Sequence, residues 1–164
     1  MSKFVDDEEE DQPFHVIDVR GWPTVEIKVL RAPYNDGEID VFQDAFLQVL
    51  NLAATGTDRI PPTKLFLLFN MDGIVQASFS QKLRAKTFIQ QVRSAAETSI
   101  HATALVVTNT LARMVLGAVM MLQPLVSVNK VFDNNDDALM WLAANKSRVS
   151  RGFPAVTDLD VATS

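Results

Sequence analysis

Between residues 65 and 142, three short apolar runs alternate with segments of helical periodicity, and this alternation constrains the fold more than any other feature. The apolar runs occupy residues 65–69, 102–107 and 126–132, and helical patterns follow at 78–97, 111–122 and 136–145. Strand–helix repeats connect through right-handed crossovers, which gives a parallel portion of sheet. The run at 65–69 is continuously apolar, as expected for a central strand with both faces covered.

Two further β-type runs, 14–19 and 25–29, precede this region, and the glycine and proline between them suit the turn of a hairpin. The second run alternates apolar with charged residues, which is the period of a strand near a sheet edge with only one covered face. A helical pattern follows at 38–54. We therefore predict an α/β fold: a single mixed five-stranded sheet with about four helices, in which an N-terminal hairpin precedes repeated strand–helix units.

The length and composition favour one domain, because 164 residues with 48% hydrophobic content can bury a core without disulfides or metal. We predict a disordered acidic tail at 1–12, the domain at 13–146 and a loose C-terminal tail at 147–164. The chain contains no cysteine, which fits a reducing compartment, and we expect a cytoplasmic protein.

The net charge of -5 disfavours nucleic acids and anionic membrane surfaces as partners, because both select basic patches. The most apolar helical segment, 111–122, is shorter than the roughly 20 residues that cross a bilayer, so we expect no membrane insertion.

No glycine-rich phosphate loop or nucleophile elbow occurs. His15 and His101 lack partners at metal-ligand spacing. We predict a protein that is not an enzyme and uses no cofactor or metal.

The segment 111–122 contains one charged residue, whereas a helix that rests on one sheet face should be polar over about half its circumference. If Val115 and Ala118 face the sheet together with Val119 and Leu122, then Leu116, Met120 and Met121 face elsewhere. Methionine suits adaptable contact surfaces, so these three residues form a candidate dimer or partner surface. Two alternatives are that other parts of the same chain cover them, or that the helix borders a pocket for a hydrophobic ligand or lipid.

The order of these elements resembles the STAS domain family, in its anti-sigma factor antagonist-like branch, also described as STAS-like or Sec14-like. The resemblance covers roughly residues 14–145. It is carried by the strand at 65–69 with the loop at 70–74, by the strand at 104–107 with Thr108 and Asn109, and by residues 131–132 and 136–142.

The resemblance implies a phosphoacceptor serine at the start of the helix that follows the central strand. The family pattern has an Asp and a Gly in the loop and an Asp-x-Ser at the helix start. Gly73 and Ser80 match this pattern, whereas Asn70 and Ser78 replace the two acids and Asp72 offers a carboxylate nearby. Independently of the family, Ser78 suits an N-cap, with Gln81 completing a capping box, and Asp72 with Gly73 suits a turn.

Together these observations predict a non-enzymatic STAS-like regulatory domain that acts by protein binding and forms a homodimer. Asp72, Gly73, Ser78 and Ser80 form its candidate recognition loop, and Leu116, Met120 and Met121 form its candidate dimer surface. The alternative function is a Sec14-like carrier of a hydrophobic small ligand or lipid.

Overall fold

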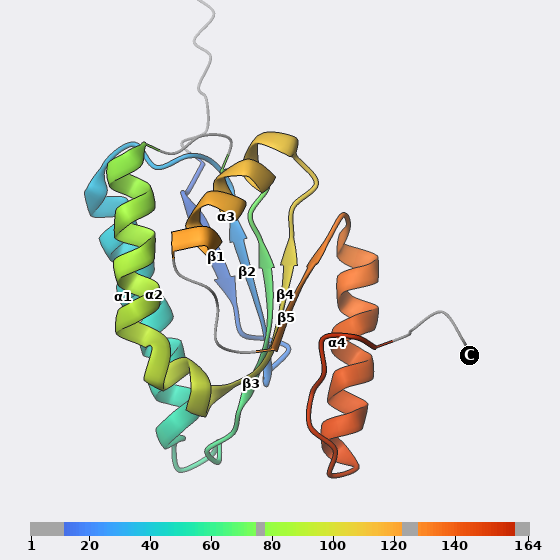
Figure 1. Cartoon of the computed structure of the whole chain (residues 1–164). Coiled ribbons are helices and arrows are strands. Elements are labelled where there is room, and N and C mark those ends of the chain that lie inside the picture. Colours follow the sequence, from blue (N-terminus) through green and yellow to red (C-terminus); the bar gives the residue numbers. More distant parts are fainter. Residues whose placement is uncertain (1–11, 75–77, 123–127, 160–164) are drawn as a thin grey trace, which may run out of the picture.

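The computed structural model describes residues 12–74, 78–122 and 128–159, in which five strands and four helices alternate (Figure 1). The elements are β1 (His15–Asp18), β2 (Thr24–Val29), α1 (Asp36–Thr55), β3 (Leu65–Asn70), α2 (Phe79–Ser99), β4 (Ile100–Val106), α3 (Thr110–Leu122), β5 (Val128–Phe132) and α4 (Asn135–Ser150).

The five strands form one mixed sheet in the order β1-β2-β3-β4-β5. Strand β1 is antiparallel to β2, and every other neighbouring pair is parallel. The predicted fold class is therefore confirmed, with β3 as the central strand. Strand β2 lies next to the edge strand β1, as its alternating pattern predicted.

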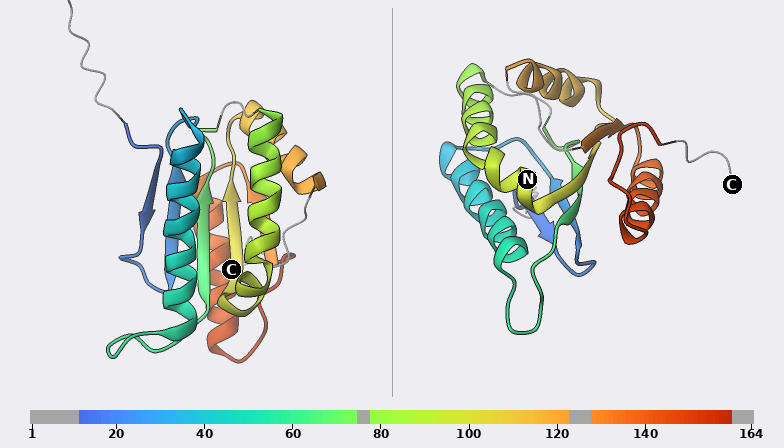
Figure 2. Two further views of the ribbon diagram at one scale, coloured as in Figure 1. Left: turned by 90° about the vertical axis from the view of Figure 1, so that its left-hand side faces the viewer. Right: turned by 60° about the horizontal axis from the view of Figure 1, so that its bottom comes forward.

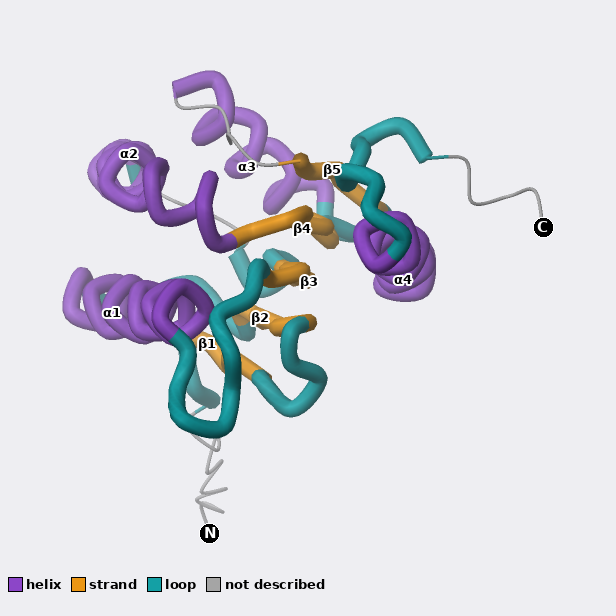
Figure 3. The backbone as a smooth tube through the Cα atoms, turned by 90° about the horizontal axis from the view of Figure 1, so that it is seen from below, coloured by secondary structure: helices purple, strands orange, loops and turns teal. Residues whose placement is uncertain are grey.

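The order of the strands explains why the helices divide unequally between the two faces. From β2 to β5 each parallel connection moves one strand in the same direction, and right-handed crossovers then place every connecting helix on the same face. Helices α1, α2 and α3 accordingly lie on one face, whereas α4, which follows the last strand, covers the other (Figures 2 and 3). The order never reverses within this sheet, so there is no topological switch point at which α/β sheets commonly bind ligands.

Each face of the sheet has its own apolar core. Val25 and Ile27 of β2, both with no exposed surface, belong to the core between the sheet and helices α1 and α2. Phe66 and Leu68 of β3 point to the opposite face and pack with Trp141 of α4. The contacts of α4 with the sheet are to β3, β4 and β5, which leaves the polar side chains of β2 partly exposed on that face.

The predicted loose tail at 147–164 is wrong for residues 147–159, because α4 continues to Ser150 and the following segment packs beside the helix. Trp141 is fully buried, and its indole Nε1 donates to the carbonyl of Thr157 at 3.1 Å. Asn145 is also fully buried; its amide donates to the carbonyl of Val156 at 3.2 Å and accepts from the same residue's N–H at 2.9 Å. A buried amide needs such partners, and the returning chain supplies them.

Candidate functional site

An apolar cavity of about 250 Å³ lies between the sheet and the three helices that share one of its faces. Its floor comes from β3 and β4, through residues such as Leu67 and Leu105, and its walls come from α1, α2 and α3. Figure 2 (left) shows α1 and α2 running side by side, with β3 and β4 visible between them and α3 beside the upper part of α2. The cavity therefore lies within the larger of the two cores.

Five phenylalanine rings line this cavity, and four of them form a chain of ring contacts. Phe42 and Phe46 come from consecutive turns of α1 with their ring centroids 6.3 Å apart. Phe46 meets Phe88 of α2 edge to face at 5.8 Å, and Phe42 meets Phe69 of β3 in the same way at 6.0 Å. These phenylalanine rings pack against one another and form much of the apolar lining of the cavity.

A few polar side chains interrupt the apolar lining. Thr103 of β4 is 6% exposed and lies on the floor. Gln43 of α1 and Gln81 and Lys82 of α2 contribute to the walls, as does Arg93 further along α2. None of the lining residues that the structure describes is an aspartate or a glutamate. An apolar space with a small number of polar groups is the usual composition of a small-molecule site.

The outside of the seam between α1 and α2 carries a shallow groove of about 400 Å³. Gln43 and Phe88 line both the groove and the inner cavity, so these two side chains separate the cavity from the surface. Beside them, the guanidinium of Arg84 on α2 bridges two carboxylates of α1, Asp36 at 3.2 Å and Asp40 at 2.8 Å. The seam is thus closed by one aromatic ring, one amide and one ion-paired arginine.

Two residues of the predicted recognition loop, Asp72 and Gly73, have structural roles in the turn after β3. The carboxylate of Asp72 accepts hydrogen bonds from the backbone N–H groups of Thr108 and Asn109, at 2.6 and 3.3 Å, and so joins this loop to the end of β4. A Cβ atom on Gly73 would lie 2.2 Å from the carbonyl oxygen of Val29, so only glycine fits beside β2 at this point.

Ser78 caps α2 as its sequence context predicted. Its hydroxyl accepts from the N–H of Gln81 at 3.1 Å, and the side chain of Gln81 accepts from the N–H of Ser78 at 2.9 Å, which completes the capping box. Ser80 is exposed in the first turn. The structure thus brings Asp72 and Gly73 together in a turn and leaves Ser80 on the surface, while residues 75–77 between them lie outside the described part of the chain.

The predicted dimer surface on α3 is wrong at Leu116, which is only 6% exposed and packs with Ala112, Leu105 and Val107 of its own chain. Met120 packs partly against the same cluster, and the side chain of Met121 lies outside the described residues. Val115 lines the cavity as expected of a residue facing the sheet.

Arg113 of α3 is exposed and makes contacts beyond its own helix. Its guanidinium donates to the carbonyl of Val107 at 3.0 Å and pairs with Asp133. Among the side chains of α3 that the structure describes, Leu111 and Met114 are the exposed apolar ones, at 55% and 67%. A helix that is apolar on almost every side has no polar face to fix its rotation, so its periodicity could not identify the buried side.

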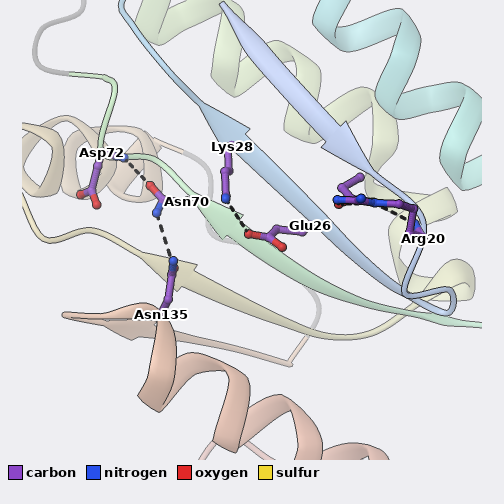
Figure 4. Close-up of polar contacts among 7 residues, drawn as sticks. Arg20, Glu26, Lys28, Asn70, Asp72 and Asn135 are labelled. Carbon is purple, nitrogen blue, oxygen red and sulfur yellow. Dashed lines mark hydrogen bonds and ion pairs between the residues drawn. The ribbon is translucent and has the colours of Figure 1, made fainter.

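The uncovered part of the opposite sheet face carries a strip of polar side chains (Figure 4). These side chains pair with one another: Arg20 with Asp18 at 2.6 Å, Lys28 with Glu26 at 3.2 Å, and Asn70 with Asn135 at 3.5 Å. Each charge in the strip has a neighbour of opposite sign, so the strip presents no unbalanced charge to a ligand.

The two histidines pack against aromatic rings. His15 lies 5.1 Å from the ring of Phe42, and His101 stacks with Phe66 at 5.1 Å. Partial burial lowers the pKa of both imidazoles from the ordinary value of 6.5. Within residues 12–74, 78–122 and 128–159, no three histidine or acidic side chains group together in a way that could hold a metal ion.

The sequence predicted the helices at 38–54 and 78–97 and the covered strand at 65–69, but it did not identify a cavity between them. The apolar periodicity of a helix is the same whether its inner face meets a packed core or an empty space. Lys82 carried a signal that could have been read from the sequence, because a cation in the first turn of a helix opposes the helix dipole and so indicates an unusual helix start.

No helix in the described segments is long and apolar enough to cross a membrane. Comparisons with protein-family models, curated proteins and solved structures found no match for this chain.

Proposed function

We propose that this protein binds a small apolar molecule in the cavity between its sheet and helices α1, α2 and α3. The observation that carries the proposal is the cavity itself, with about 250 Å³ of space enclosed mainly by phenylalanine and aliphatic side chains. Such a lining holds an apolar ligand through burial and offers few polar groups for chemistry. Binding, carrying or sensing such a molecule therefore fits the site better than catalysis does.

The contacts that this space leaves unmade support the proposal. Apolar side chains that border a gap lose dispersion contacts on that side. An apolar occupant would restore those contacts.

The volume limits the size of the ligand. A cavity of about 150 Å³ holds one benzene molecule, so a cavity of 250 Å³ has room for a ligand of about 10 non-hydrogen atoms. Pockets for drug-sized ligands begin at about 300 Å³. We therefore propose a small ligand and not a two-chain lipid, which narrows the carrier function suggested by the sequence.

Thermal unfolding with a panel of small apolar compounds tests this function. 1-Octanol, indole and n-octylamine have suitable sizes, and a ligand at 100 times its Kd stabilises the folded state by about 2.7 kcal/mol. We expect at least one compound to raise the Tm, and native mass spectrometry to show one bound molecule per chain. If no compound in the panel raises the Tm and no complex is observed, the proposed function is wrong.

As a second candidate we propose that the chain acts as a STAS-like domain through protein contacts, with self-association through α3. The exposed side chains of Leu111 and Met114 favour this candidate. Light scattering of the wild type and the Met114→Glu variant tests it, with Met140→Glu on α4 as the control because Met140 is 52% exposed on the opposite side of the sheet. A dimer that only Met114→Glu dissociates supports the candidate, and a monomeric wild type contradicts it.

A further inference from the structure

We infer that the ligand of the cavity is an apolar monocarboxylate whose carboxylate lies beside Lys82 of α2. This inference rests on the proposed binding function and adds the charge and the orientation of the ligand to it.

The first observation is the sign of the charges that line the cavity. Among the described residues, Lys82 and Arg93 are the charged residues of the lining, and both are cations. The chain as a whole has 20 acidic and 15 basic residues, so the described lining, which contains no carboxylate, is opposite in sign to the protein. Such a lining favours an anionic group on an otherwise apolar ligand.

The second observation is that the two cations are not equally available. Arg93 pairs with Glu97 one turn along the helix, with 3.7 Å between its Nε and the carboxylate oxygen. Lys82 has no carboxylate within ion-pair distance among the residues that the structure describes. The two residues are 11 positions apart, or about 16 Å along the helix axis, so they mark opposite ends of the cavity wall. The anionic group therefore belongs at the Lys82 end.

The third observation is the position of Lys82 within its own helix. Helices α1 and α4 each begin with two acidic residues in the first turn, as the helix dipole favours, whereas α2 and α3 have none there and carry a cation at the fourth position, Lys82 and Arg113. Arg113 is paired with Asp133, whereas Lys82 has no carboxylate partner among the described residues, so its charge opposes the dipole of α2 without compensation. A bound carboxylate would be attracted by both the ammonium group and the positive end of the helix.

The fourth observation is the partial exposure of Lys82, which lines the cavity and also reaches the surface. Lysine commonly packs its methylene stem against apolar surface while its ammonium group stays in water. The ligand then places its apolar part among the phenylalanine rings and its carboxylate at the rim. This arrangement avoids the cost of burying an unpaired charge.

Calorimetric titration with octanoate and with 1-octanol tests the inference, because the two compounds are similar in size and differ in charge. We expect octanoate to bind about 5-fold more tightly than 1-octanol at low salt, which is the size of a partly exposed ion pair. The variant Lys82→Gln should remove this difference and leave the affinity for 1-octanol unchanged. Lys86→Gln, one turn further along α2 and not part of the lining, is the matched control and should bind octanoate as the wild type does.

The outcomes separate the inference from the function on which it rests. If octanoate and 1-octanol bind equally well, or if Lys82→Gln keeps the preference for octanoate, the inference is overturned and the apolar site remains. If Lys86→Gln weakens octanoate binding as much as Lys82→Gln does, the effect is one of overall charge and the inference is also overturned. If neither compound binds, the inference is overturned, and the proposed function fails with it only if no other compound of the panel raises the Tm.

Discussion

Replacing Ala85 by leucine should both stabilise the protein and weaken ligand binding. Ala85 lies in α2, and its side chain lines the cavity. Leucine at this position extends into space that no protein atom occupies. Alanine and leucine have similar helix propensities, so the substitution leaves the intrinsic stability of α2 almost unchanged.

The expected gain follows from the three additional carbon atoms. Each buried methylene contributes about 0.8 kcal/mol, which gives an upper value of about 2.4 kcal/mol for complete burial in the cavity. We expect an increase of about 2 kcal/mol in the free energy of unfolding. For a chain of this size that increase corresponds to a rise in Tm of about 4–8 °C.

Urea unfolding at equilibrium measures the stability, and calorimetric titration with 1-octanol measures the binding. The matched control is Ala143→Leu, which makes the same change at an exposed position of α4 and should alter neither quantity. We expect Ala85→Leu to raise the urea midpoint and to weaken 1-octanol binding, because leucine and ligand compete for the same volume.

A loss of more than about 1 kcal/mol in Ala85→Leu would refute this reasoning, since overpacking of a filled core costs about 1–3 kcal/mol. A gain in stability with unchanged affinity for 1-octanol would also refute it. In that case the space beside Ala85 would exist but would not be the binding site.

Three further predictions concern the loop after β3, the N-cap of α2 and the ion pair at the end of β1. Gly73→Ala should lower the free energy of unfolding, measured by urea unfolding, by about 2 kcal/mol or more. The Cβ atom of the new alanine would overlap backbone atoms of β2 that cannot move away. Ser78→Ala should cost about 1 kcal/mol in the same assay through loss of the cap, whereas Ser80→Ala should be close to neutral. Hydrogen bonds from Arg20 lower the pKa of Asp18 from 3.8 to about 2, so the ion pair stabilises the protein above pH 3.8 and is lost as the pH falls towards 2. An NMR titration of the Asp18 carboxyl group should show its midpoint near 2 in the wild type and close to 3.8 in Arg20→Gln; equal midpoints would contradict the assignment.

The order of strands and helices was predictable because the spacing of apolar residues in the strand segments differs clearly from their spacing in the helix segments along most of the chain. The continuous apolar run that became β3 predicted a strand with both faces covered, and the alternating run that became β2 predicted one open face. The cap of α2 was predictable for a similar reason, since Ser78 and Gln81 stand at capping-box spacing.

The rotation of α3 and the packing of the C-terminal segment were not predictable by the same reasoning. Leu116 and its neighbours are apolar on almost all sides of the helix, so the periodicity did not show that Ala112 and Leu116 would be the residues buried against Leu105 and Val107. The segment 151–159 contains mostly small and polar residues, and its order depends on hydrogen bonds to Trp141 and Asn145 that no local pattern reveals.

The cavity could not be predicted because a cavity and a packed core require the same residue types at the same periods. Whether a space remains between the Phe46–Phe88 ring pair and the sheet depends on how far α1 and α2 lie from the strands. That separation is a property of the assembled layers, and the periodicity of either helix contains no information about it.

A crystal structure of the protein grown with 1-octanol tests the central claim most directly. The claim predicts one octanol molecule between the sheet and helices α1 and α2, with its chain in contact with Leu67, Phe46 and Phe88. A structure in which α2 packs directly on β3 and β4 without a cavity, or in which octanol lies only on the surface, would contradict it.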